Sequence, residues 1–119
     1  MLFPYLDHHV ELWGGDGVSY GNVFAVNRNG YFGPVCDDNW TNTEASTVCR
    51  QLGFDFGTYR KNSFFGTVPS IFAMDNVFCS SSDNVIQDCE YQDETTENCG
   101  EDEGAGVSCY YNSGHLKSK

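Results

Sequence analysis

The chain has 119 residues, enough for one domain and too few for two of ordinary size, and it carries six cysteines and a formal net charge of −11. This charge disfavours nucleic acids and anionic membranes as partners, because both require a basic surface, and it favours cations or basic proteins. No apolar run is long enough to insert into a membrane, and the first residues lack the pattern of a signal peptide.

The expected organisation is one domain with two loose ends. We expect a disordered N-terminal extension over residues 1–8, a domain over residues 9–111 and a flexible C-terminal tail over residues 112–119. Asn29-Gly30 between two apolar runs is typical of a hairpin turn. Apolar runs bounded by turn signals predict short strands over residues 10–13, 23–26, 31–36, 71–74 and 105–110. A stretch of mixed polar and apolar residues over 84–89 predicts a single helical turn.

The only convincing helix begins near Thr41. Thr41 and Glu44 fit a capping box, in which each side chain accepts a hydrogen bond from the other's free backbone N–H. Apolar side chains then recur with helical spacing and form one buried face: Ala45, Val48, Cys49 and Leu52. Gly53 is well placed to end the helix, because it adopts the left-handed conformation cheaply. Short strands with one helix predict a small α+β domain, and the buried position of Cys49 predicts a covalent link beneath the helix.

The cysteines indicate disulfides. None of them forms a Cys-x-x-Cys pair, which makes a zinc ribbon or finger a weak interpretation. Disulfides in an oxidising compartment fit better, and six cysteines allow fifteen pairings that the residues alone do not distinguish. A domain of this size has a limited core, so bridges that each contribute roughly 2–4 kcal/mol would matter.

The sharpest polar feature is Asp37-Asp38, two carboxylates beside a cysteine at the end of a predicted strand. Calcium is bound by several oxygen ligands on a rigid or semi-rigid loop, and a third carboxylate from the acidic run Glu101-Asp102-Glu103 would complete such a site. The alternative is that Asp37 and Asp38 only cap a turn, because Asp side chains accept hydrogen bonds from nearby backbone N–H groups.

Two further polar features are weaker. Asp75-Asn76 is a second cation candidate, with Asp55 as a further ligand, and its alternative is an ordinary turn. Asn39 begins an Asn-Trp-Thr sequon, so a glycan on Asn39 is expected if the chain is secreted.

The aromatic side chains offer a possible binding surface. The pairs at 64–65 and 110–111 are candidates, since aromatic residues are enriched at protein interfaces, although most aromatics in such a domain belong to its core.

An enzyme is not predicted. The three histidines lie near the termini, and the sequence contains no nucleophile elbow, zinc-protease motif or phosphate-binding glycine loop.

Nearly the whole chain resembles the scavenger receptor cysteine-rich domain, and the resemblance is carried by five segments: Val10 to Gly15, Phe32 to Trp40, Val48 to Gly53, Met74 to Cys79 and Glu103 to Cys109. The resemblance implies a curved antiparallel β-sheet that cradles one α-helix. Six cysteines are similar to the family's group A pattern, which implies three disulfides: Cys36–Cys99, Cys49–Cys109 and Cys79–Cys89.

The resemblance also implies a function. Members of this family bind proteins, microbial surfaces or polyanions outside the cell, often with calcium. The family's main cation site corresponds to Asp37, Asp38 and Glu103, and a second site corresponds to Asp75 and Asn76, where the family has two aspartates. Members that bind polyanions use exposed arginines, and this chain has few.

We therefore expect a secreted or extracellular, non-enzymatic module with a calcium site that supports recognition of a protein, microbial or polyanionic ligand. One alternative is a calcium-independent module whose acidic face docks a basic partner. Another is a small secreted effector. No oligomeric state is predicted.

Overall fold

The computed structural model describes residues 7–94 and 98–112. The expected extension and tail therefore lie mostly outside the described residues. Of the expected extension, Asp7 and His8 are described and lie in a 3-10 turn, and the carbonyl of His8 accepts a hydrogen bond from Gln51. No helix within these residues is long and apolar enough to span a membrane.

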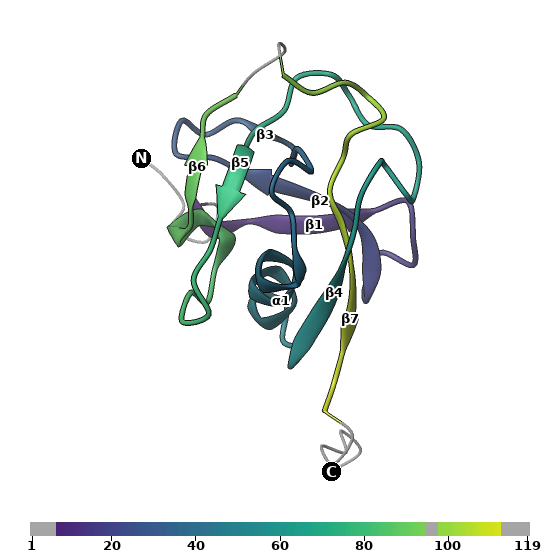
Figure 1. Cartoon of the computed structure of the whole chain (residues 1–119), viewed down its shortest axis with the longest axis vertical. Helices are drawn as coiled ribbons and strands as arrows, with labels where there is room; N and C mark the ends of the chain where they lie inside the picture. Colours follow the sequence, from purple (N-terminus) through teal and green to yellow (C-terminus); the bar gives the residue numbers. More distant parts are fainter. Residues whose placement is uncertain (1–6, 95–97, 113–119) are drawn as a thin grey trace.

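A five-stranded antiparallel sheet forms the body of the domain (Figure 1). Its strands run in the order β1, β2, β7 and β4, and β3 pairs with β2 beside this path. Figure 1 shows α1 beside β4 and β7, against which it packs. The bounds of the strands are β1 Val10–Trp13, β2 Tyr20–Val26, β3 Phe32–Pro34, β4 Phe56–Arg60 and β7 Gly106–Tyr110.

The hairpin between β2 and β3 is confirmed. Gly30 has a φ of 87°, a left-handed conformation that favours glycine, and Gly30 N–H donates to the Asn27 carbonyl. The side-chain Oδ1 of Asn27 also accepts hydrogen bonds from the backbone N–H groups of Asn29 and Tyr31. The turn is therefore fixed by an asparagine that precedes the predicted Asn-Gly pair.

A second, two-stranded sheet pairs β5, Asp75–Phe78, with β6, Glu90–Gln92. A short 3-10 helix, Ile86–Asp88, confirms the expected helical turn between them. The prediction of a strand over residues 71–74 is wrong, because this run forms isolated contacts and no continuous ladder. Ala73 N–H donates to the Pro34 carbonyl, and Met74 forms an isolated parallel bridge with Val35. β4 and β6 were not predicted.

Helix α1, Asn42–Gln51, begins and ends as the sequence predicts. Thr41 and Glu44 form the capping box, and Gly53 has a φ of 101° just after the helix. Glu44 does more than cap. Its side chain is only 2% exposed, and its Oε2 accepts the backbone N–H of Cys79 at 2.9 Å, so the start of the helix is tied to the end of β5.

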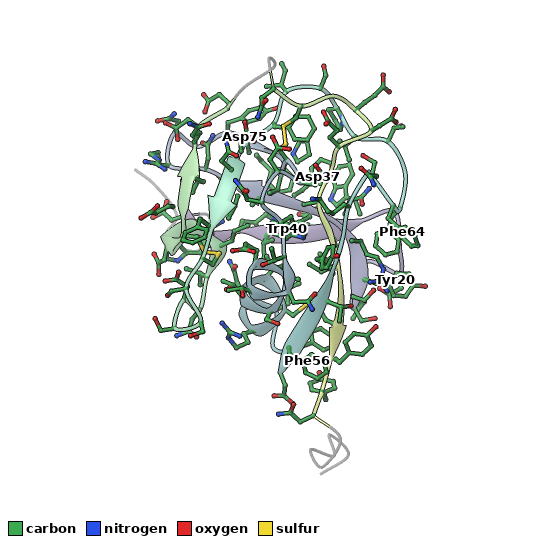
Figure 2. The ribbon with its side chains drawn as sticks, viewed as in Figure 1. Tyr20, Asp37, Trp40, Phe56, Phe64 and Asp75 are labelled. Atoms are coloured by element: carbon green, nitrogen blue, oxygen red, sulfur yellow. A yellow bond between two sulfur atoms is a disulfide. The ribbon has the colours of Figure 1, made fainter. Side chains whose placement is uncertain are left out.

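Three disulfides join these elements, and they are the pairs that the resemblance implies: Cys36–Cys99, Cys49–Cys109 and Cys79–Cys89. Cys49 links α1 to β7, as its place on the buried helix face predicts. Trp40 lies at the centre of the core, 1% exposed, and its Nε1–H donates to the Gly106 carbonyl at 2.9 Å (Figure 2). The molecule is thus a small α+β domain with a helix, antiparallel sheets and three disulfides.

Candidate metal site

Two distant segments meet where the chain leaves β3. Cys36 pairs with Gly104 in an isolated antiparallel bridge, and Asp37 N–H donates to the Glu103 carbonyl at 2.9 Å. The Cys36–Cys99 disulfide joins the same two segments. These contacts fix the backbone of Asp37 against that of Glu103, although the two residues are far apart in the sequence.

The structure brings together the three residues that the sequence predicts as the main cation site. One carboxylate oxygen from each of Asp37, Asp38 and Glu103 lies within 4.8 Å of the others. Asp37 is buried, with 4% of its surface exposed, whereas Asp38 and Glu103 are partly exposed. The cluster therefore has a buried side and a side that faces solvent.

The electrostatics of the cluster favour a cation. Burial raises the pKa of the Asp37 carboxyl above its ordinary value of 3.8, and the negative charges of Glu103 and Asp38 raise this pKa further. The N–H of Asn62 and the charge of Lys61 act in the opposite direction without cancelling the rise. An ionised Asp37 is thus costly in the metal-free protein, and a bound cation would relieve that cost.

Each of the three carboxylates accepts a hydrogen bond that orients it. Asp37 Oδ2 accepts the backbone N–H of Asn62 at 2.7 Å, and Glu103 Oε1 accepts the backbone N–H of Gly100 at 2.6 Å. Asp38 Oδ2 accepts Nδ2–H of Asn98 at 2.7 Å. Three oriented carboxylates suit a hard divalent cation such as calcium, which prefers oxygen ligands. The residues present therefore fit a calcium ion.

The second predicted site is only partly assembled. Asp75 is 2% exposed, and its Oδ2 accepts a hydrogen bond at 2.9 Å from Nδ2 of Asn98, the same nitrogen that reaches Asp38. Asn76 is already engaged, because its side chain accepts from Asn39 Nδ2 at 2.9 Å and donates to Gln92 Oε1 at 3.0 Å.

Asp55 lies apart from this pair. Its N–H donates to the Tyr110 carbonyl, and its Oδ2 accepts the N–H of Asn112 at 2.8 Å, at the start of β4. Figure 2 shows Asp75 near one end of the molecule and Phe56, the neighbour of Asp55, near the other. The structure therefore groups Asp75 with Asp38 and not with Asp55.

Sequence reasoning missed the donors that orient the cluster. Asn62, Asn98 and Gly100 follow no motif, and they reach the carboxylates only because the loops before β5 and β7 fold over the end of β3. Asn98 immediately precedes Cys99, so its place next to a disulfide of the site is the one local signal that pointed to it.

Comparison with known proteins decides the family. A model of the scavenger receptor cysteine-rich (SRCR) domain matches residues 13–110. This chain belongs to the SRCR family. SRCR domains are typically extracellular ligand-binding modules, and nothing in the comparisons points to catalysis.

Two similar proteins are much longer than this chain. The chain is 40% identical over 101 residues to a scavenger receptor cysteine-rich domain superfamily protein of Patiria pectinifera, covering 84% of this chain and 9% of that protein. It is 34% identical over 100 residues to the macrophage receptor MARCO of Mus musculus, covering 84% of this chain and 18% of that protein. The chain thus spans less than a fifth of either relative.

Two solved SRCR structures have the same fold. The third SRCR domain of murine neurotrypsin superposes with a TM-score of 0.75 at 36% identity, covering 88% of this chain and 98% of that one. The dimeric form of the SRCR domain of mouse MARCO gives a TM-score of 0.65 at 33% identity, covering 76% of this chain and 85% of that one.

Proposed function

We propose that this SRCR domain is a non-enzymatic extracellular ligand-binding module that holds one calcium ion at Asp37, Asp38 and Glu103. The observation that carries the proposal is the convergence of three carboxylates within 4.8 Å, one of them buried, at the junction of two distant segments. The ligand class is a protein, or a microbial or other polyanionic surface.

The chain's own residues perform three tasks at this site. Asn62, Asn98 and Gly100 hold the three carboxylates in place, so little side-chain freedom is lost when a cation binds. Asp37 supplies a buried oxygen, and the partly exposed Asp38 and Glu103 leave the solvent side open. A bound calcium ion would supply positive charge and free coordination positions there, which an anionic group of a ligand can occupy.

Calcium titration by isothermal calorimetry tests this proposal. The oxidised wild-type protein, after treatment with a chelator, is expected to bind one calcium ion, and Asp38→Ala is expected to lose that binding. Asp102→Asn is the matched control, since it removes an exposed negative charge next to Glu103 and should bind calcium as the wild type does. Heat of binding that is absent in the wild type, or unchanged in Asp38→Ala, would contradict the proposal.

A second candidate function has its own supporting observation. Exposed carboxylates occur at Glu90 on β6, at Glu94 shortly after it, and at Glu101 and Asp102 before β7, in a chain with a net charge of −11. An acidic surface of this kind can dock a basic protein without a metal ion. Ligand binding that survives a chelator and weakens with added salt would favour this candidate over the calcium-dependent one.

The receptor context is also a proposal. The relative from mouse is named a macrophage receptor, and this chain covers 18% of it. We infer that the domain lies outside the cell, where its three disulfides are stable. Recovery of the folded, oxidised protein from the medium of a secreting host, and its absence from the cytosolic fraction in oxidised form, would support this location.

A further inference from the structure

The loop that contacts Asp37 also carries an exposed aromatic surface. We call this the Phe64 surface and define it by its members: Tyr20, Arg60, Lys61, Phe64 and Phe65. The side chain of Phe64 is 65% exposed and lies edge-on to Phe65, with 5.0 Å between ring centroids. Tyr20 is 42% exposed and lies 5.5 Å from Phe65. Figure 2 shows Phe64 and Tyr20 close together on one side of the domain.

This loop is held rigidly. Asn62 and Ser63 have φ values of 61° and 51°, in the left-handed region that residues other than glycine rarely adopt. Ser63 Oγ donates to the Glu101 carbonyl at 2.7 Å and accepts the N–H of Gly104 at 2.8 Å. Asn22 Nδ2–H donates to the Gly66 carbonyl at 2.7 Å. A strained backbone persists only where its surroundings fix it, so Phe64 is presented to solvent in one preorganised position.

The charges of the Phe64 surface differ from those of the rest of the chain. The guanidinium of Arg60 lies over the Phe64 ring, 5.5 Å from its centroid. Neither Arg60 nor Lys61 makes an ion pair with a carboxylate in the described part of the chain, whereas Arg28 pairs with Asp93 at 2.9 Å. Arg60 thus lies over an exposed ring, Lys61 follows Arg60 in the chain, and neither has an ion-pair partner among the described residues, in a protein of net charge −11. At physiological salt, charges act over about 8 Å, so Arg60 and Lys61 attract an anionic group near the ring, while the adjoining carboxylates of the candidate cation site oppose it unless a cation is bound there.

We propose that the Phe64 surface docks an acidic segment of a protein partner, whose apolar side chain packs on Phe64 and whose carboxylates pair with Arg60 and Lys61. Aromatic residues and arginine are the types that dominate protein interfaces. An anionic membrane is a broad charged surface that meets the acidic remainder of the domain, whereas a short acidic segment meets only the Phe64 surface. A sulfated polysaccharide would use the two cations without needing the Phe64 ring. The charge of the surface complements an acidic partner.

This inference deepens the proposed function and rests on it, because it names the ligand of the same module. The Phe64 surface adjoins the candidate cation site, since the N–H of Asn62 donates to Asp37 and the charge of Lys61 acts on Asp37. Without a cation, the three carboxylates of that site repel an acidic segment. Calcium would remove this repulsion, so the acidic partner is expected to bind more tightly when calcium is present.

Selection from a phage-displayed library of random dodecapeptides tests the inference. The full chain, oxidised and calcium-loaded, is the target, and the Phe64→Ala protein is used to remove peptides that bind elsewhere. Selected peptides are expected to combine Asp or Glu with aromatic or large aliphatic residues. Synthetic copies are expected to bind at least about tenfold more weakly to Phe64→Ala and to Arg60→Glu than to the wild type.

A matched control is available on β5. Phe78 is also 65% exposed, and β5 lies on the other side of the domain from Phe64 in the shared view of Figures 1 and 2. Phe78→Ala should bind the selected peptides as the wild type does. Peptides rich in Lys or Arg, equal losses in Phe64→Ala and Phe78→Ala, or a library that yields no binder would each overturn the inference. Competition by heparin oligosaccharides that is unaffected by Phe64→Ala would assign the surface to a polysaccharide and overturn it as well.

The two proposals fail in different ways. Calcium uptake by calorimetry together with no selected peptide overturns the docking surface alone. Peptide binding that depends on Phe64 together with no calcium uptake overturns the calcium site, and shows a docking surface that acts without a metal ion.

Discussion

The backbone N–H of Asn62 donates to Oδ2 of Asp37 at 2.7 Å, and this hydrogen bond joins the buried carboxylate of the candidate cation site to the loop that carries Phe64. Asn62 has a φ of 61°, so its N–H reaches the carboxylate from a conformation that asparagine tolerates better than most residues. The bond therefore connects the proposed calcium ion to the proposed docking surface through a single residue.

The raised pKa of Asp37 predicts how Asp37→Asn changes stability. In the metal-free protein, the folded state keeps the Asp37 proton to a higher pH than the unfolded chain does. The free energy of unfolding therefore falls as pH rises from 3.8 through the folded-state pKa, and the loss is complete above that value. Asp37→Asn removes this loss and keeps an acceptor for Asn62. We expect the variant to be more stable than the wild type at pH 7 in EDTA, and equally stable below pH 3.8.

Calcium should reverse that order. Calcium at one hundred times its dissociation constant would stabilise the wild type by about 2.7 kcal/mol and leave Asp37→Asn unchanged. Urea unfolding with EDTA and with calcium measures both effects, with Asp102→Asn as an exposed control expected to stay within about 0.5 kcal/mol. Lower stability of Asp37→Asn in EDTA at pH 7 would show that its carboxylate is stabilised by its surroundings, contrary to this account.

We expect the conservative substitution Glu44→Gln to lower the free energy of unfolding substantially. Its buried carboxylate accepts the N–H of Thr41 on one oxygen and the N–H of Cys79 on the other. Glu44→Gln turns one acceptor into a donor, so either the buried N–H of Cys79 or the partly buried N–H of Thr41 loses its partner. We expect a loss of about 1.5–3 kcal/mol in the free energy of unfolding. Glu90→Gln, at an exposed position on β6, should change it by less than about 0.5 kcal/mol. Similar values for the two variants would argue against the link.

The helix could be predicted because its signals are local. The capping box at Thr41 and the glycine at position 53 lie within one short stretch, and both act as expected. The second partner of Glu44 could not be predicted, since Cys79 lies 35 residues away. β4 was missed because Phe56–Arg60 shows no alternation of apolar and polar residues. This strand is held by contacts with distant segments, since it pairs with β7 and packs against α1. Gly57 N–H, for example, donates to Ser46 of the helix.

The candidate site also has a part that the sequence predicts and a part that depends on distant contacts. Asp37 and Asp38 stand out in the sequence because two carboxylates follow a cysteine. Their meeting with Glu103 depends on the Cys36–Gly104 bridge, which no local pattern predicts. The acidic run over 101–103 offered three candidates for the third carboxylate, and only the family resemblance singled out Glu103. The donor residues Asn62 and Asn98 belong to loops whose paths only the folded chain reveals.

The disulfides should contribute unequally. The chain-entropy relation predicts that loss of Cys49–Cys109, with a sequence separation of 60, costs about 4 kcal/mol. Loss of Cys79–Cys89, with a separation of 10, should cost about 3 kcal/mol. Paired Cys→Ala variants and chemical denaturation measure both values. A greater loss from the shorter loop would show that packing around Cys79, and not loop closure, sets the contribution.

Asn39 predicts a glycan. It is exposed, follows Asp38 directly, and its Nδ2 donates to Asn76 Oδ1 at 2.9 Å. Secretion from a eukaryotic host should give a protein whose mass falls on treatment with a peptide N-glycosidase, and Asn39→Gln should lack that mass. Thr41→Ser keeps both the sequon and a capping hydroxyl, so this variant should remain glycosylated. A wild-type mass that matches the bare chain would contradict the prediction.

The central claim is a calcium ion at Asp37, Asp38 and Glu103, and a calcium titration followed by amide NMR tests it most directly. The N–H groups of Asn62 and Gly100 each donate to one of these carboxylates, at 2.7 and 2.6 Å, so their resonances report on the site. We predict that both shift with one shared binding curve in the wild type and stay fixed in Asp38→Ala, while the Gly53 amide beyond α1 moves in neither protein. Calcium binding that leaves Asn62 and Gly100 unmoved, or no binding at all, would contradict the account.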